Sequence, residues 1–150
     1  MRVGPFSHAD KRLLNDLCLA PHARLGAEAD RHETGLIGDG EMGAEVYAVA
    51  RKRDQARIIF DEARQMVRSS PDLSKRVQSF KLNLSIDRTA SKFEPLSSDE
   101  KTGDGLNPSL VLVDELHRHK SRALLDLMDA GMGARRQPLL RIITTAGDDD

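Results

Sequence analysis

Apolar and polar residues follow two different periods between residues 46 and 143. Residues 46–50, 110–113 and 139–143 are short, nearly uninterrupted apolar runs, a pattern typical of strands buried in a parallel sheet. Residues 52–68 and 121–132 instead carry apolar side chains at helical spacing, which predicts helices that pack one side against that sheet. We therefore expect an α/β fold with a mainly parallel sheet flanked by helices.

A hairpin is expected between the first helix and the second apolar run. Apolar residues occupy every second position from Phe80 to Ile86, as in a half-exposed strand, and residues 91–96 can return as its partner across residues 87–90. The expected order is strand, helix, inserted β-hairpin, strand, helix and strand, in one domain without an internal repeat. Pro71 and Asp72 are expected to end the first helix, and Gly131 and Gly133 the second.

Composition limits the class of protein. A chain of 150 residues with 39% hydrophobic content can bury one modest core. The net charge of −1 predicts no overall attraction to DNA, and the basic residues between Arg51 and Arg68 alternate with acidic ones, which favours a solvated helix face over a DNA contact. Cys18 is the one cysteine, so no internal disulfide can form. No apolar run has the length of a membrane span or a signal peptide, so we expect a cytoplasmic protein.

Candidate chemistry begins where the second apolar run ends. Asp114 and Glu115 directly follow residues 110–113 (LVLV). In nucleotide hydrolases this is the Walker B arrangement, in which a buried strand carries an Asp to magnesium and a following Glu to the attacking water. A buried strand followed by a solvated acidic turn explains these six residues equally well, so the surrounding sequence must decide.

The surrounding segments carry a family resemblance. They are residues 40–50 (GEMGAEVYAVA), 104–108 (DGLNP), 116–120 (LHRHK), 133–140 (GARRQPLL) and 142–147 (IITTAG). In this order they closely resemble the ATPase domain of the large terminase subunit of tailed bacteriophages, over roughly residues 38–147. The resemblance implies a partial P-loop NTPase-like fold and a motor that uses ATP and Mg²⁺ to package viral DNA into procapsids.

The resemblance also implies roles for individual residues. Asp114 would hold Mg²⁺ through a water, and Glu115 would polarise the lytic water. Thr144, Thr145 and Gly147 occupy the positions of the terminase coupling motif, where hydroxyls at the tip of an adjacent strand sense the terminal phosphate of ATP.

Partners follow from the same resemblance. Arg135 and Arg136 stand in a loop before the last strand, where a guanidinium could reach a phosphate bound by a neighbouring subunit of a homo-oligomeric ring. The other implied partners are double-stranded DNA, the small terminase subunit, the portal and the procapsid, in the cytoplasm of the bacterial host and without a membrane.

The chain departs from the family at the phosphate-binding loop. A P-loop needs a glycine-rich turn followed by Lys and Ser or Thr, and no Gly-Lys pair occurs in this sequence. The family places that loop just before residues 40–50, where residues 20–35 are polar and lack an apolar face. Gly35, Gly38 and Gly40 could form a residual anion-binding turn, although glycines at such spacing usually form simple turns.

This departure shapes the expected domain organisation. Residues 1–35 are expected to be a divergent segment, disordered or out of frame, in which residues 7–19 can form a short helix. Residues 36–150 would be a partial terminase ATPase domain, and the nuclease domain of the family would be absent. The change in sequence character near Leu36 suggests a shifted reading frame or a degraded prophage gene.

Several functional interpretations stay open. His117 and His119 next to Asp114 suggest a zinc or manganese site, but a third ligand is not evident, so a pair of loop histidines is favoured. A nuclease would need several separated carboxylates. The remaining interpretations are a packaging ATPase fragment whose phosphate cradle comes from another segment or chain, a non-catalytic remnant or interaction fragment, and a helicase-like ATPase with an Asp-Glu-x-His box. We expect a terminase ATPase fragment that is inactive alone.

Overall fold

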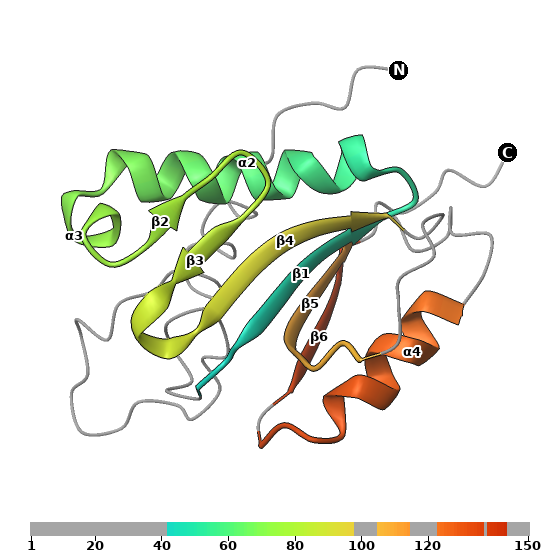
Figure 1. Ribbon diagram of the computed structural model, residues 1–150. Coiled ribbons are helices and arrows are strands. Elements are labelled where there is room, and N and C mark those ends of the chain that lie inside the picture. The colour runs from blue at the N-terminus through green and yellow to red at the C-terminus, as the bar shows by residue number, and fades with distance from the viewer. Residues whose placement is uncertain (1–41, 98–104, 115–122, 137, 144–150) are drawn as a thin grey trace, which may run out of the picture.

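The computed structural model describes residues 42–97, 105–114, 123–136 and 138–143 (Figure 1). Its strands are β1 (Glu45–Ala50), β2 (Gln78–Ser79), β3 (Leu84–Ile86), β4 (Ser91–Ser97), β5 (Pro108–Asp114) and β6 (Leu139–Ile143). Its helices are α2 (Arg53–Ser69), α3 (Pro71–Ser74) and α4 (Ala123–Met132), with a 3-10 turn at Asp87–Thr89. The predicted helix at residues 7–19 and the domain boundary near residue 36 lie outside the described residues.

All six strands form one sheet in the order β2-β3-β4-β1-β5-β6. Strand β1 pairs in parallel with β4 and β5, and β5 pairs in parallel with β6. The three apolar runs of the sequence are therefore neighbouring parallel strands, and the predicted α/β fold with a mainly parallel sheet is confirmed.

The predicted hairpin is present in a shorter form. Strands β3 and β4 are antiparallel, with Leu84 opposite Phe93. Phe80 belongs to the turn between β2 and β3, because its N–H donates to the Asn83 carbonyl at 2.8 Å, and its side chain is 54% exposed. The second strand of the hairpin is β4, which lies beside β1 in the middle of the sheet.

Helix α2 covers one face of the sheet over β4 and β1 (Figure 1). Its buried residues are Ala56, Ile59, Phe60, Ala63 and Val67, which confirms the predicted apolar face. The Phe60 ring packs edge-on against Phe93, with centroids 5.6 Å apart. Pro71 follows α2, as predicted, and is also the first residue of α3. The missing N–H of proline is tolerated at that position.

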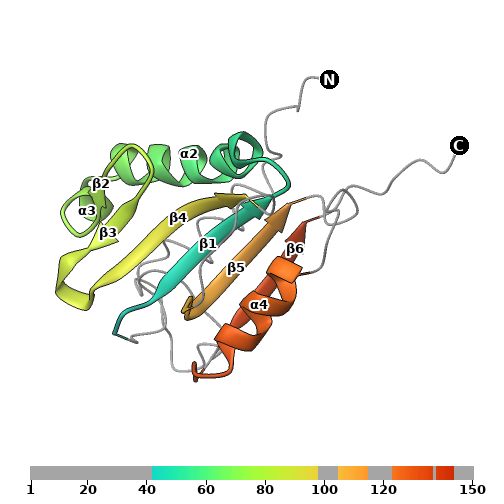
Figure 2. The same cartoon turned by 45° about the vertical axis from the view of Figure 1, so that its right-hand side comes forward.

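Helix α4 covers the opposite face over β5 (Figure 2). Met128 and Met132 pack there against Tyr47, Val49, Val111 and Val113. Gly131 was expected to stop this helix but lies within its last turn. A Cβ atom at Gly131 would stand 2.5 Å from the Leu106 carbonyl oxygen, so glycine is needed for the close approach of α4 to the segment before β5.

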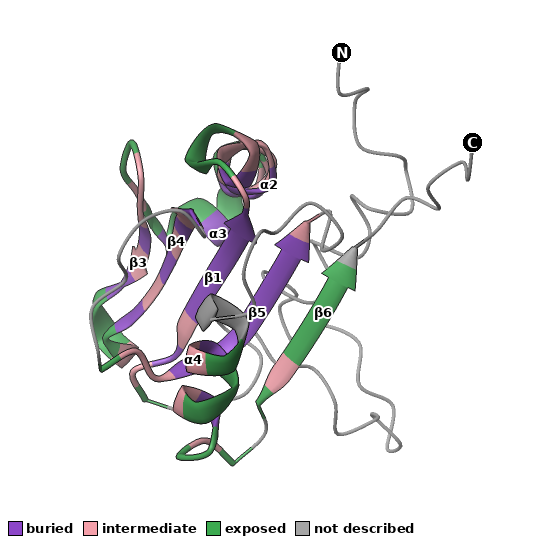
Figure 3. Ribbon diagram, turned by 90° about the vertical axis from the view of Figure 1, so that its right-hand side faces the viewer, coloured by how far each residue is buried: buried purple, intermediate pink, exposed green. Residues whose placement is uncertain are grey.

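Strand β6 is less buried than its apolar sequence predicts. The side chains of Leu140 and Ile142 are 38% and 46% exposed, and Figure 3 shows β6 as an exposed strand at the end of the sheet. The prediction that this strand is buried is therefore wrong. Among the described strands β6 pairs with β5 alone, so apolar composition here does not reflect a central position.

Candidate active site

Asp114 is the last residue of β5 and stands at the carboxyl edge of the sheet. The six preceding residues of β5 are buried, whereas Asp114 is half-buried. This change is what an apolar strand that ends in a carboxylate requires, since an ionised carboxylate is costly to bury without partners. The buried strand β5 thus ends with a carboxylate at the sheet edge, and the Walker B role of Asp114 stays a prediction.

The chain connections place Asp114 at a point where the strand order reverses. Strand β1 leads through α2 to β4 on one side, and β5 leads through α4 to β6 on the other, with the two helices on opposite faces. In open α/β sheets, ligands bind outside the carboxyl ends of the strands at such a point. The geometry therefore favours a ligand site beside the ends of β1 and β5.

The end of β6 reaches the same level as Asp114. In the parallel pairing of β5 with β6, Asp114 is opposite Ile143, the residue before Thr144. The candidate residues Glu115, Thr144, Thr145 and Gly147 lie outside the described residues, as do His117 and His119 of the alternative metal site. Their roles stay predictions.

Arg51 is a further cation at this edge, directly after the last residue of β1. Its carbonyl accepts a hydrogen bond from Ser97 Oγ at 2.9 Å, and Ser97 is 4% exposed. The Arg51 Nε atom is buried without a hydrogen-bond partner. Charge spacing alone places Arg51 in a basic cluster, whereas its position as the first polar residue after an apolar run is the sequence signal for the sheet edge.

Arg135 lies at the opposite, amino edge of the sheet. Its Nε and Nη2 atoms donate to the Asn107 carbonyl at 2.9 and 2.8 Å, Nη1 donates to the Met42 carbonyl at 3.3 Å, and Nη2 also donates to the Gly43 carbonyl. Arg136 follows it and is exposed. The structure therefore does not bring Arg135 together with Asp114 within one chain, and a contact with a phosphate of another subunit stays a prediction.

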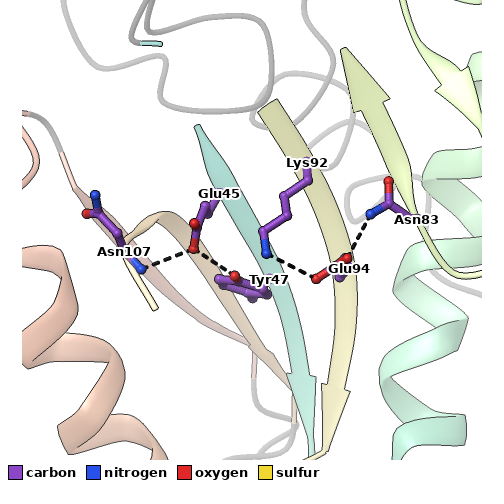
Figure 4. Close-up of polar contacts among 6 residues, drawn as sticks. All are labelled: Glu45, Tyr47, Asn83, Lys92, Glu94 and Asn107. Carbon is purple, nitrogen blue, oxygen red and sulfur yellow. Dashed lines mark hydrogen bonds and ion pairs between the residues drawn. The ribbon is translucent and has the colours of Figure 1, made fainter. Parts of the chain in front are cut away.

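A polar network occupies the same end of the sheet (Figure 4). Glu45 Oε2 accepts hydrogen bonds from the Tyr47 hydroxyl at 2.7 Å and from the Asn107 N–H at 3.0 Å. Burial, and then the hydrogen bond to Glu45, raise the pKa of Tyr47 far above its usual value. Tyr47 therefore stays protonated as a hydrogen-bond donor, which suits a structural role at the starts of β1 and β5.

Strand β4 extends this network away from β1. Lys92 Nζ lies 3.5 Å from Glu94 Oε2 and 5.5 Å from the centroid of the Tyr47 ring. Asn83 Nδ2 donates to Glu94 Oε1 at 2.7 Å, so the network joins the turn before β3 to β4, and Lys92 joins β4 to Tyr47 on β1 (Figure 4). Not every polar atom of the network is paired, since Asn83 Oδ1 is buried without a hydrogen-bond partner.

Within the described residues, no group of three or more His, Cys, Asp or Glu side chains is arranged to hold a metal. None of its helices combines the length and apolar character needed to cross a bilayer.

Known proteins resemble this chain in sequence. Residues 33–150 match the family described as terminase large subunit, ATPase domain. The large terminase subunit of Enterobacteria phage HK97 is 30% identical over 121 residues, which are 77% of this chain and 24% of that protein. Protein YmfN of Escherichia coli strain K12 is 55% identical over 47 residues, which are 31% of this chain and 10% of that protein.

Solved structures resemble it in fold. The crystal structure of the HK97 bacteriophage large terminase superposes with a TM-score of 0.64 at 29% identity, over 73% of this chain and 24% of that one. The large terminase ATPase domain of Thermus phage P74-26 has the same fold, with a TM-score of 0.56 at 20% identity, over 71% of this chain and 49% of that one. The chain thus spans about a quarter of its HK97 relative, and it belongs to the terminase large subunit ATPase domain family.

Proposed function

We propose that this chain contributes the metal-binding and water-activating side of an ATP-hydrolysing site. Asp114 would hold Mg²⁺, Glu115 would polarise the lytic water, and Thr144, Thr145 and Gly147 would respond to the terminal phosphate of ATP. The observation that carries the proposal is the alignment of Asp114 with Ile143 at the carboxyl edge of the sheet. Ile143 is followed directly by the two threonines.

The residues fit a magnesium ion. Mg²⁺ retains several waters and is usually bound by one or two carboxylates together with substrate phosphates, so a half-buried Asp at a strand end is a suitable ligand. When bound with ATP, the ion would neutralise charge that develops on the phosphates. Asp114 would orient the ion, and Glu115 would orient the attacking water.

The phosphates of ATP need donors that this sequence does not supply as a Gly-Lys turn. We therefore propose that another segment or chain provides the phosphate cradle. The exposed position of β6 supports this division, because Leu140 and Ile142 leave apolar surface on the strand that leads to the threonines. Residues 1–35 are proposed to be divergent, by frameshift or prophage decay.

The proposed biological role is that of a fragment of the motor that packages double-stranded DNA into procapsids. It would act in the host cytoplasm with the small terminase subunit, the portal and other copies in a ring. Arg136 is the better candidate for a contact with a neighbouring subunit's phosphate. Arg135 already donates to the carbonyls of Met42, Gly43 and Asn107, which supports a structural role for it.

A second candidate is a non-catalytic remnant that keeps part of the fold. The absence of a Gly-Lys pair from the sequence favours it, because without the cradle the binding energy to the phosphates is missing. A helicase-like ATPase is less well supported than either, since the family match covers residues 33–150.

ATP hydrolysis by two proteins tests these candidates. The purified chain should hydrolyse Mg-ATP no faster than background. A chimera in which residues 1–38 are replaced by the corresponding segment of a relative with a Gly-Lys-Ser/Thr turn should hydrolyse ATP. In this chimera Glu115→Gln should abolish the activity. The control Glu62→Gln, which removes the same charge from α2, should leave it intact. A chimera without Glu115-dependent hydrolysis would refute the ATPase proposal and favour the remnant. Glu115-dependent hydrolysis by the original chain would refute the need for an added cradle.

A further inference from the structure

Helix α2 carries a row of arginines along one flank, interrupted at the turn that holds Phe60 and Asp61. At about 3.6 residues per turn, positions 53, 57, 64 and 68 fall within about 60° of one another around the helix axis. Over these positions the helix rises about 22 Å, at about 1.5 Å per residue. We call this row, made of Arg53, Arg57, Arg64 and Arg68, the α2 arginine stripe.

The stripe lies beside the buried face of α2, next to the turn between β2 and β3. Arg64 marks this position, since its Nη1 donates to the Lys81 carbonyl at 3.3 Å, and Figure 1 shows that turn running along α2. Arg64 also pairs with Asp61 at 3.0 Å and stands 6.0 Å from the Phe60 ring centroid. Arg64 is therefore held in place by the protein itself.

The other members of the stripe present charge to the surface. Arg53 and Arg68 are exposed, and Arg57 is half-buried. The Arg57 Nε atom is buried without a hydrogen-bond partner, although buried donors are normally paired. Two carboxylates, Asp54 and Asp61, border the row, so it keeps an excess of positive charge on a chain whose net charge is −1.

The sequence alone favours a solvated face for these residues, but because the arginines gather on one flank of α2 we propose that the α2 arginine stripe binds the phosphate backbone of duplex DNA. A duplex strand offers one phosphate for about every 3.4 Å of its axis, so a line of arginines about 22 Å long can meet phosphates at many registers. An acidic protein would have to match the uneven spacing of this row with its own carboxylates. Contacts of this kind position DNA without reading its sequence.

We take duplex DNA as the ligand in line with the proposed packaging role, while the charge argument depends only on α2. The stripe does not involve Asp114 or the carboxyl edge of the sheet, so DNA binding should need neither ATP nor Glu115. A test without nucleotide therefore separates failure of this proposal from failure of the ATPase proposal.

Salt-dependent binding of a labelled duplex of random sequence to the full chain, followed by fluorescence anisotropy, tests the stripe. Each lost phosphate contact makes the negative slope of log K against log salt shallower by about 0.9. The double variant Arg57→Gln/Arg68→Gln should therefore have a slope less negative by about 1.8. Over a fourfold rise in salt its affinity should fall by a factor about 12 times smaller than that of the unaltered chain. Arg88→Gln/Arg141→Gln removes the same charge from exposed positions elsewhere and should leave the slope unchanged.

Three results would overturn the proposal. They are the absence of duplex binding by the unaltered chain at low salt, equal slopes for the two double variants, and tighter Arg57- and Arg68-dependent binding of polyglutamate than of duplex. The last would identify an acidic protein as the partner. If the stripe variant unfolds at a lower temperature than the unaltered chain, Arg57→Lys/Arg68→Lys replaces it in the test. This variant keeps the charge, so its slope should equal that of the unaltered chain. A different slope in a stably folded lysine variant would also contradict the proposal.

Discussion

Gly131→Ala should destabilise the fold even though alanine is the better helix former. Gly131 lies in the last turn of α4, where a Cβ atom would stand 2.5 Å from the Leu106 carbonyl oxygen and 3.0 Å from Pro108 Cδ. The nearest obstacle is backbone, so no side-chain rotation can relieve the contact. Helix α4 and the segment that leads into β5 would have to move apart.

The cost can be approximated from two opposing effects. Overpacking in a tight contact typically costs about 1–3 kcal/mol, whereas alanine in place of glycine inside a helix gains at most about 1 kcal/mol. Relaxation is restricted because the segment before β5 is held by the Asn107 N–H on Glu45 and by Arg135 on the Asn107 carbonyl. Because the nearest obstacle is backbone at 2.5 Å, we take the upper end of the overpacking cost, about 2–3 kcal/mol. Less the gain of up to about 1 kcal/mol, this leaves a net loss of about 1–2 kcal/mol, or a drop in Tm of about 2–8 °C for a chain of this size.

Thermal and urea unfolding of the purified variants measures this loss. Gly133→Ala is the matched control, because its Cβ atom would meet only the Ala130 carbonyl oxygen, at 3.4 Å, and its stability should stay within about 0.5 kcal/mol of the unaltered chain. A Gly131→Ala protein as stable as the unaltered chain, or as the Gly133→Ala protein, would refute the close approach of α4 to Leu106.

Two further predictions concern the amino edge of the sheet. Tyr47→Phe removes the hydrogen bond to Glu45 and should cost about 0.5–1.5 kcal/mol in urea unfolding at pH 7. Because the pKa of Tyr47 is raised by folding, its neutral form stabilises the fold below the unfolded pKa of about 10, and stability should fall as pH rises above that value. Tyr47→Phe should lack this component of alkaline destabilisation, and equal pH profiles would contradict it. A lysine at position 135 cannot span the carbonyls of Gly43 and Asn107, so Arg135→Lys should cost about 2–3 kcal/mol in the same assay. Arg136→Lys, at an exposed position, is the control and should cost under about 0.5 kcal/mol. Equal costs would exclude a structural role for Arg135.

Sequence periodicity determined the local elements because it records which side of each segment is apolar. Helix α2 and strands β1 and β5 follow their predicted bounds within about two residues. Asp114 was identifiable for the same reason, as the carboxylate that ends an apolar run. The family resemblance, carried by an ordered series of segments, was also available from sequence and is confirmed by the match over residues 33–150.

Tertiary structure decided what depends on neighbours distant in the chain. Arg135 reaches the Met42 carbonyl across 93 positions, and Gly131 faces Leu106 only because α4 crosses that segment. The exposure of Ile142 depends on where β6 lies in the strand order, which its own apolar sequence does not encode. Periodicity reports the polarity of a face, whereas the partner of that face is set by the path of the whole chain.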